Sequence, residues 1–278
     1  MKNVTEYKYP SNVSQALSLF SEQKHSTYIA GGTHLASGNR NNTIRLIDIT
    51  RLGLNEIKDG DENIEVGATT TITDMYNSPI VKKVGKGVLK KACRLIGDTP
   101  LRNAITLGGN IARLYTWAGL PVMLLTLDAE IEIINPLEKT YSVEAVEHIT
   151  NGGIRDGDII LNVKFPQKNS WFHAYEKFAL TTVDYTWLTM AFAAEVKEGQ
   201  ITDARLAVSR ITKVTRITPV EKALIGQLVS QLDLEKLKSL LKSSVDIVQD
   251  YRVSKEYRSQ LLGVIFKRML QKLQEETQ

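Results

Sequence analysis

The sequence predicts an α+β fold in which helices alternate with short strands. Ser11 to Lys24 carries apolar residues at helical spacing. Ile44 to Ile49 and Ile64 to Ala68 place apolar residues at alternate positions, as half-buried strands do. Two glycine pairs, at residues 31–32 and 108–109, fall at junctions between such elements. The opening of the chain is therefore expected to be a small α+β unit and not a helix bundle.

The first helix is expected to begin at Ser11 or Asn12, because either side chain can accept a hydrogen bond from the first turn. Tyr28 to Ala30 follows as a short buried strand that runs into the first glycine pair. After the two strands named above, Thr73 or Asp74 is a candidate cap for a further short helix.

The middle of the chain continues this alternation. Val88 to Ile96 has the spacing of a helix, and a Gly-Asp-Thr-Pro turn at residues 97–100 is expected to end it. After the second glycine pair, Pro121 to Ala129 is predicted to be helical and Glu130 to Ile134 to be a strand. Asp158 to Phe165 is predicted to be the strand that closes this region.

A domain boundary is predicted at Pro166 to Ser170, which is polar and punctuated by proline. It divides the chain into a first domain, residues 1–168, and a second domain, residues 169–278.

The second domain is predicted to contain a hairpin and several helices. Trp171 to Phe178 has the pattern of a strand, whereas Asp184 to Val196 fits either a buried strand or a helix. Gly199 to Val208 is expected to return as the partner strand of a hairpin. Three helices are predicted to follow, over Val220 to Val229, Leu234 to Val248 and Lys255 to Leu273.

Composition narrows the possible functions. The single cysteine, Cys93, cannot hold an iron–sulfur cluster or a cysteine-rich zinc site, so any such cluster is expected on another chain. The four histidines are scattered, and no metal site is predicted. Basic residues are spread along the chain among acidic ones, with a formal charge of +4, so nucleic acid is not an expected partner.

The sequence also lacks the signals of membrane insertion and export. No segment is long and apolar enough to span a bilayer, and Met1 to Pro10 carries charges and tyrosines where a signal peptide needs an apolar run. A cytoplasmic protein without a membrane partner is therefore expected.

The first glycine pair belongs to the run Ala30-Gly31-Gly32-Thr33-His34, directly after a short apolar strand. Consecutive glycines let the backbone adopt positive φ and turn several N–H groups toward one point, which is a geometry that binds phosphate. The same composition also suits a tight turn that simply requires glycine. From these residues alone, both interpretations stay open.

The second glycine pair belongs to the similar run Thr106-Leu107-Gly108-Gly109-Asn110. Two such loops could converge on the phosphates and ribose of one dinucleotide, with threonine and asparagine side chains as further donors. Neither run matches the Gly-x-Gly-x-x-Gly fingerprint or the phosphate loop that ends in Gly-Lys-Ser/Thr. A Rossmann or P-loop nucleotide site is therefore not expected.

The order of these motifs resembles the medium, FAD-binding subunits of molybdenum hydroxylases, a family that includes xanthine dehydrogenase and the flavoproteins of aerobic carbon monoxide dehydrogenase. The resemblance covers nearly the whole chain. It is carried by the two glycine runs together with Ile96-Gly97-Asp98, Arg102-Asn103, Leu127-Asp128-Ala129, Tyr175 to Phe178, Asp184, Gly199-Gln200-Ile201, Ala204-Arg205 and Pro219 to Gly226.

The resemblance implies an α+β fold with a vanillyl-alcohol-oxidase (PCMH)-type FAD-binding domain of two subdomains. A smaller α+β C-terminal domain, with a three-stranded sheet and helices, would follow it. The implied cofactor is FAD, with Tyr175 or Lys177 near its ring system. The residues implied to bind it are Ala30, Gly31, Gly32, Thr33, His34, Leu35, Ile96, Gly97, Thr106, Gly108, Gly109, Asn110 and Lys177.

The resemblance also implies a function that needs no catalytic side chain in this chain. The flavin would take electrons from iron–sulfur clusters of a partner subunit, which receives them from a molybdenum-cofactor subunit, and would pass them to NAD or another acceptor. Two alternatives stay open. One is a degenerate scaffold subunit that binds FAD weakly, and the other is a free-standing FAD oxidoreductase of the same fold.

The chain departs from the family pattern after the second glycine run. Relatives usually carry an aspartate just before a Leu-Pro pair, where this chain has Gly119 before Leu120-Pro121. Tyr115 and Thr116 stand near the usual acidic residue and proline, and Ala104-Ile105 replace the usual Arg-Gly. A hydrogen bond to a charged group contributes about 1.5–3 kcal/mol, so the missing aspartate is expected to weaken FAD binding about tenfold or more.

Overall fold

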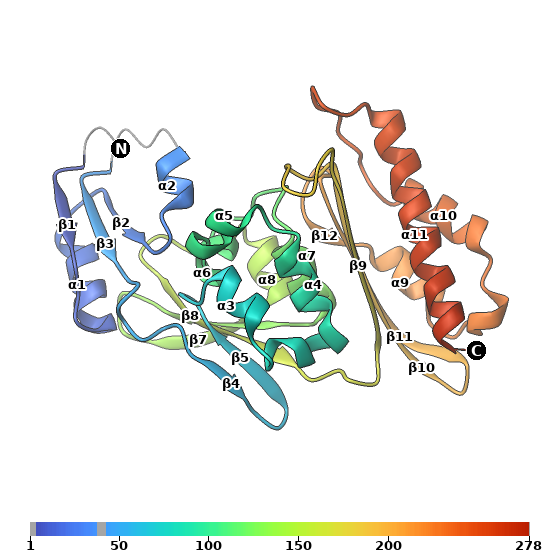
Figure 1. Cartoon of the computed structure of the whole chain (residues 1–278), viewed down its shortest axis with the longest axis horizontal. Helices are drawn as coiled ribbons and strands as arrows, with labels where there is room; N and C mark the ends of the chain where they lie inside the picture. The colour runs from blue at the N-terminus through green and yellow to red at the C-terminus, as the bar shows by residue number, and fades with distance from the viewer. Residues whose placement is uncertain (1–3, 38–42, 278) are drawn as a thin grey trace.

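A computed structural model describes residues 4–37 and 43–277. The parts of the sequence-based predictions that concern residues 1–3 and 278, at the ends of the two predicted domains, lie outside these ranges. Figure 1 shows a small sheet near the N-terminus, a central sheet with helices on one side, and a third sheet covered by the C-terminal helices.

The N-terminal unit is a parallel sheet of order β1-β3-β2, formed by β1 (Glu6–Lys8), β2 (Ser26–Ile29) and β3 (Arg45–Asp48). Helix α1 (Val13–Glu22) buries Ala16 and Leu17 against Ile47 of this sheet. The predicted cap is confirmed at Asn12, whose side chain accepts a hydrogen bond of 2.8 Å from the Gln15 N–H. A short helix, α2 (Thr33–Ser37), follows β2 across the first glycine pair.

The central unit is an antiparallel sheet of order β4-β5-β8-β6-β7. Its strands are β4 (Ile57–Asp59), β5 (Asn63–Gly67), β6 (Glu130–Ile134), β7 (Thr140–Glu144) and β8 (Ile159–Pro166). Helices gather on one side of it (Figure 1) and bury the largest hydrophobic cluster of the described residues against it. They are α3 (Ile72–Asn77), η1 (Val81–Gly87), α4 (Val88–Arg94), α5 (Thr99–Ala104), α6 (Leu107–Ile111), α7 (Leu120–Thr126) and α8 (Ala145–Thr150).

Two predictions in this unit need correction. Helix α3 is capped by Thr71 and not by Thr73 or Asp74, since the Thr71 hydroxyl accepts a bond of 3.1 Å from the Asp74 N–H. The turn at residues 97–100 ends α4 but also begins α5, because the Asp98 carboxylate caps the Leu101 N–H at 2.8 Å. The strands β4 and β7 and the helical elements η1, α6 and α8 were not predicted, and the second glycine run, expected as a loop, forms most of α6.

The C-terminal unit is an antiparallel sheet of order β12-β11-β10-β9. The three predicted strands are β9 (Phe172–Phe178), β10 (Leu188–Lys197) and β11 (Gln200–Ser209), and the two-residue strand β12 (Thr215–Arg216) adds a short fourth edge. The ambiguous segment is thus a strand. The helical elements after it are α9 (Thr218–Leu224), η2 (Val229–Gln231), α10 (Leu234–Ser243) and α11 (Lys255–Thr277).

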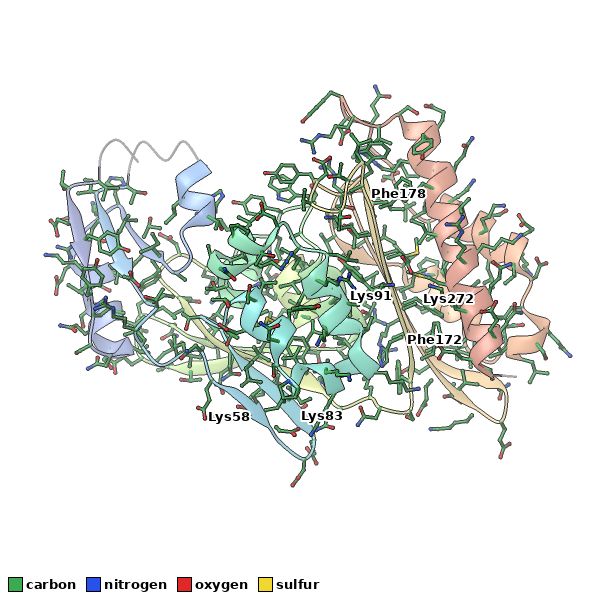
Figure 2. The ribbon with its side chains drawn as sticks, viewed as in Figure 1. Lys58, Lys83, Lys91, Phe172, Phe178 and Lys272 are labelled. Atoms are coloured by element: carbon green, nitrogen blue, oxygen red, sulfur yellow. The ribbon has the colours of Figure 1, made fainter. Side chains whose placement is uncertain are left out.

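The central and C-terminal units share contacts across the predicted boundary. Tyr175, Ala191 and Ala207 of the third sheet are part of the hydrophobic cluster of the central unit. Figure 2 shows Lys91 and Lys272 near β9, where both ammonium groups bind the Glu176 carboxylate, at 3.0 and 3.1 Å. The division of the chain at residue 168 stays a prediction.

A salt-bridge network joins the same two units. The Asp128 carboxylate accepts hydrogen bonds of 2.9 and 3.0 Å from Arg205 Nε and also binds Lys168. The Lys168 ammonium lies 3.9 Å from the ring centre of Trp171.

None of the helices within the described ranges combines the length and hydropathy that a membrane span requires.

Candidate cofactor site

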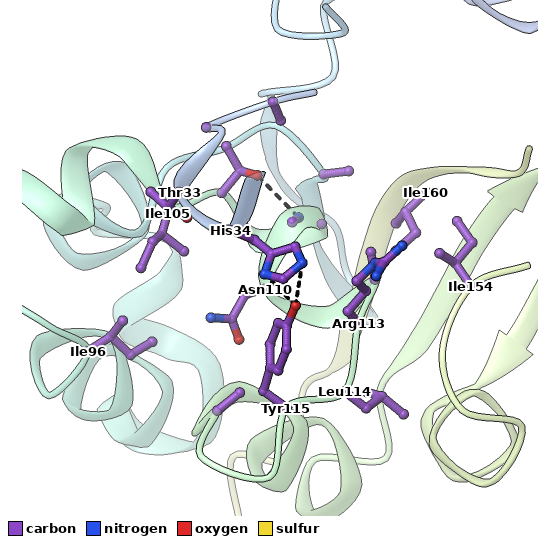
Figure 3. A pocket seen from close by; sticks show the side chains of 18 of the residues that line it. Thr33, His34, Ile96, Ile105, Asn110, Arg113, Leu114, Tyr115, Ile154 and Ile160 are labelled. Carbon is purple, nitrogen blue, oxygen red and sulfur yellow. Dashed lines mark hydrogen bonds between the residues drawn. The ribbon is translucent and has the colours of Figure 1, made fainter. Parts of the chain in front are cut away.

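A cavity of about 990 Å³ lies where the three units meet, and every residue implied to bind FAD lines it. This volume is at the upper end of the range of about 300–1,000 Å³ for small-molecule sites. The cavity wall combines the first glycine loop, the α4–α5 turn, α6, the segment at residues 112–119, the loop at residues 152–158, the first residues of β8 and residues of β9 and β10. Figure 3 shows part of this wall.

The first glycine loop, residues 30–35, approaches the end of α5 so closely that only glycine fits. A Cβ atom on Gly31 would lie 1.5 Å from the Ala104 carbonyl oxygen. Gly32 has a φ of +67°, in the left-handed region that side chains disfavour. Within the described residues, neither the Gly31 nor the Gly32 N–H donates to an acceptor. Both donors are therefore available to a ligand in the cavity.

The second glycine loop, residues 106–110, differs because its N–H groups are used inside the protein. Leu107 donates to the Thr70 carbonyl at 2.9 Å, and Gly108 donates to the Ala68 carbonyl at 2.7 Å. The Gly109 N–H donates to the Thr106 hydroxyl at 3.2 Å, which caps α6, and the Asn110 N–H donates to the Thr106 carbonyl at 3.0 Å. This loop offers the cavity no backbone donor from residues 107–110.

The second loop still offers the cavity a side chain. Asn110 Oδ1 is buried and has no hydrogen-bond partner among the described residues. Leaving such an atom unpaired costs about 1–3 kcal/mol, which a ligand donor would offset. A glycine cradle with open N–H groups and an unpaired buried acceptor are features that fit a bound nucleotide cofactor.

A row of aromatic rings connects the first loop to the far wall of the cavity. The Tyr115 hydroxyl lies 2.5 Å from Nδ1 and 2.8 Å from Nε2 of His34 (Figure 3). Tyr115 stacks on Trp117, with ring centres 4.6 Å apart, and Trp117 meets Tyr185 edge-on at 5.5 Å. Burial lowers the pKa of His34, and the charge of Arg113 lowers it further.

Lys177 lies at the end of the cavity formed by β9 and the α4–α5 turn. Its ammonium donates to the carbonyl oxygens of Leu95 and Thr182, each at 2.9 Å. Burial lowers the pKa of Lys177, and the charge of Asp184 opposes this shift. The carbonyl bonds hold the side chain beside Ile96 and Gly97, which line the same end.

Gly119, where the family resemblance led us to expect an aspartate, has no room for a side chain. A Cβ atom at this position would lie 2.2 Å from the Tyr175 hydroxyl. Tyr175 is 1% exposed and also lines the cavity. The absence of a side chain at Gly119 therefore leaves space for the Tyr175 hydroxyl.

Some residues of the cavity wall were not assigned to the site from the sequence. A third glycine pair, Gly152-Gly153, was a signal that could have indicated one missing wall. Gly153 has a φ of +103°, and a Cβ there would lie 2.5 Å from the Ala112 carbonyl oxygen. The unassigned wall includes Tyr28, Arg113, Leu114, Trp117, Ile154, Asp156, Ile160 and Tyr185.

Comparison with known families agrees with this combination of fold and cavity. Residues 3–168 match the FAD binding domain in molybdopterin dehydrogenase, and residues 173–273 match the CO dehydrogenase flavoprotein C-terminal domain. The chain belongs to the family of FAD-binding subunits of molybdenum hydroxylases. Its cofactor is FAD, and it is a flavoprotein component of an oxidoreductase, which confirms the family, fold class and cofactor predicted from the sequence.

Relatives match this chain along almost their entire length. The glyceraldehyde dehydrogenase medium chain of Sulfolobus acidocaldarius is 27% identical over 93% of this chain and 94% of its own. The nicotine 6-hydroxylase medium subunit of Paenarthrobacter nicotinovorans is 26% identical over 95% of each chain. A structure of carbon monoxide dehydrogenase from Hydrogenophaga pseudoflava has the same fold, with a TM-score of 0.89, 24% identity and 95% coverage of each chain.

Proposed function

We propose that this chain is the electron-transfer subunit of a molybdenum hydroxylase complex. It takes electrons from iron–sulfur clusters of a partner subunit and passes them to NAD or another acceptor. The single observation that carries this proposal is the convergence of both glycine loops and β9 on one cavity in a chain of this family. When bound, FAD supplies the redox chemistry, and the protein supplies position and electrostatics.

The cavity residues named from the sequence hold FAD in this proposal. The Gly31 and Gly32 N–H groups donate to the pyrophosphate, and Asn110 Oδ1 accepts a hydrogen bond from the cofactor. Lys177 contributes its positive charge at the end of the cavity that β9 forms, where we expect the ring system to lie. Residues 1–168 form the FAD-binding domain and residues 169–278 form the C-terminal domain.

The partners follow from what this chain's own side chains can hold. Burial raises the pKa of the Cys93 thiol to about 12, so this lone cysteine is not a thiolate ligand for a cluster. The relatives described above are named medium chain or medium subunit, names that place them in assemblies with other chains. We therefore propose an iron–sulfur subunit and a molybdenum-cofactor subunit as partners.

Co-expression with iron–sulfur and molybdenum subunit genes from the same source tests this function. Affinity purification through this chain is expected to recover all three subunits with FAD, which denaturation releases into the supernatant. Candidate substrates are an aldehyde, an N-heterocycle and carbon monoxide. Adding an accepted substrate under anaerobic conditions is expected to bleach the flavin absorbance.

Three results would reject or replace this proposal. A chain that oxidises one of these compounds without partners is a free-standing oxidoreductase. A complex that forms but never takes up FAD identifies the chain as a scaffold, the alternative that Gly119 first suggested. If the complete complex turns over substrate at the molybdenum site but its flavin stays oxidised, the proposed electron route is wrong.

A further inference from the structure

We propose that the Arg113 side chain neutralises the pyrophosphate of FAD and thereby supplies the charge that the second glycine loop does not. This inference rests on the FAD site proposed above and adds a residue to it. It depends on the position of Arg113, on its lack of an ion-pair partner and on the bonding of the second loop.

The backbone on both sides of Arg113 is fixed. The Ala112 N–H donates to the Gly108 carbonyl at 2.8 Å, and the Ala112 carbonyl accepts a bond of 3.2 Å from the Ile154 N–H. The Arg113 carbonyl accepts a bond of 3.0 Å from the Tyr115 N–H. Arg113 is therefore held directly after α6, with a side chain that lines the cavity beside Ile154 and Ile160 (Figure 3).

The Arg113 guanidinium has no carboxylate within 4.0 Å and no hydrogen-bond acceptor among the described residues. Two other cations near the cavity are engaged, whereas Arg155, which also lines it, has no ion-pair or side-chain hydrogen-bond partner among the described residues. Arg102 donates to the Gly97 carbonyl at 2.8 Å, and Lys177 binds two carbonyl groups. An unpaired guanidinium on a cavity wall is free to form two parallel hydrogen bonds to a phosphate group.

The charge of Arg113 acts on the residues that join the two loops. Burial lowers the pKa of His34 and the Arg113 charge adds to this effect, whereas burial raises the pKa of Tyr115 and the Arg113 charge opposes it. His34 belongs to the first loop, and its imidazole contacts the Tyr115 hydroxyl. The Arg113 charge thus acts on both His34 of the first loop and Tyr115 of the segment after α6, the two residues through which these segments contact each other.

The dinucleotide needs a cation at this place. FAD carries negative charge on both phosphates, and the open N–H groups of Gly31 and Gly32 in the first loop carry no net charge. The N–H groups of residues 107–110 are already bonded within the protein.

Binding of FAD and of ADP to the full chain, stripped of flavin, tests the proposal. ADP carries the pyrophosphate without the flavin, and displacement of FAD reports its affinity. Arg113→Gln is expected to weaken both ligands about tenfold or more at low salt, as loss of a charged hydrogen bond does. It is also expected to reduce the dependence of FAD affinity on salt. Arg113→Lys is expected to restore part of the affinity.

Two further variants serve as controls. Arg94→Gln makes the same change of charge on an exposed side chain outside the cavity, and we expect wild-type affinity. Arg155→Gln removes another cation of the cavity wall, whose charge acts on Tyr141. We expect this second variant to weaken FAD binding less than Arg113→Gln does.

The outcomes separate this inference from the function on which it rests. If the wild-type chain binds no FAD, the proposed FAD site itself is wrong. If wild type binds FAD and folded Arg113→Gln binds it equally well, the inference alone is wrong. A loss for FAD without a loss for ADP would also overturn it, because the pyrophosphate would not be the group that Arg113 recognises. An equal loss in Arg155→Gln would overturn it too, because the effect would then belong to the general charge of the wall and not to Arg113.

Discussion

In the first glycine loop, Gly31 and Gly32 have N–H groups without an acceptor among the described residues, whereas in the second loop each N–H from Leu107 to Asn110 is bonded within the protein. The backbone conformations differ as well. Gly32 has positive φ, but Gly108 and Gly109 lie in helix α6 with φ outside the left-handed region. Similar runs of residues therefore use glycine for different purposes.

The difference separates ligand binding from packing. Open N–H groups in a turn with positive φ can surround an anion, so the first loop is suited to contact the cofactor directly. Gly108 instead lets α6 pack against Ala68 at the end of β5, where a Cβ would lie 2.8 Å from the Ala68 Cβ. We expect substitutions in the first loop to impair cofactor binding more than stability, and the reverse in the second loop.

The largest expected effect on stability is that of Gly108→Ala. The new Cβ would lie 2.9 Å from the Ala68 carbonyl oxygen in addition to the contact with its Cβ, so α6 must shift. We expect the free energy of unfolding to fall by about 3 kcal/mol, as overpacking does. Gly109→Ala is the control, since its Cβ meets only Thr106 Oγ1, at 2.9 Å. Equal urea midpoints for the two variants would contradict the packing role of Gly108.

Gly119→Asp tests whether restoring the family aspartate helps this chain. The Tyr175 hydroxyl lies 2.2 Å from the position of the new Cβ, so we expect a loss of about 2 kcal/mol in stability and no gain in FAD affinity. Tyr175→Phe removes the clashing oxygen, and the next atom, Cζ, lies 3.4 Å from that position. The double variant is therefore expected to regain part of the stability in urea unfolding. Tighter FAD binding by Gly119→Asp alone would show that the wall is less rigid than described.

Gly32→Ala is expected to act on the cofactor more than on the fold. A side chain at a φ of +67° costs about 1–2 kcal/mol, and relief of that strain would move the Gly31 and Gly32 N–H groups. Gly53→Ala is a matched control, with a φ of +73°, no atom within 4 Å of the new Cβ and a position outside the cavity. Similar unfolding curves with a tenfold or greater loss of FAD affinity in Gly32→Ala alone would support the comparison. If Gly32→Ala and Gly53→Ala bind FAD with equal affinity, the first glycine loop does not contact the cofactor as we propose.

The smallest expected effect is a pH dependence of FAD binding through His34. Because burial and the Arg113 charge lower its pKa, the imidazole is neutral at pH 7 in the free chain. As the pH falls through that lowered pKa, His34 gains a proton, and its positive charge attracts the pyrophosphate. We expect FAD affinity to rise about threefold as the pH falls through this lowered pKa, the size of a weak ion pair. Calorimetric titration of His34→Asn with FAD should show a flatter dependence of affinity on pH. If the affinity of the wild-type chain falls on acidification while that of His34→Asn does not, this role of His34 is excluded.

Local sequence patterns determined most of the helices and strands. Asn12 caps α1 as predicted because capping involves only neighbouring residues, and the long helix α11 has apolar residues at helical spacing throughout. The glycine runs and their order along the chain also gave the family, the fold class and the cofactor. These features depend on residues close together in the sequence or on their order, both of which a single sequence contains.

Tertiary structure decided the features that depend on distant partners. Residues 188–194 of β10 are all buried, because α7 covers one face of the sheet and α11 the other, so no alternation distinguished a strand from a helix. The N–H groups of Leu107 and Gly108 are used by Thr70 and Ala68, which precede α3.

Two further features of the cavity wall could not be predicted from the sequence for the same reason. The Tyr175 hydroxyl lies against Gly119, although the two residues belong to different units of the fold, and Arg113 has no carboxylate partner among the described residues. A sequence specifies which groups are present, but only the packed chain decides which N–H is already bonded, which glycine has room for a Cβ and which cation still lacks a counter-ion.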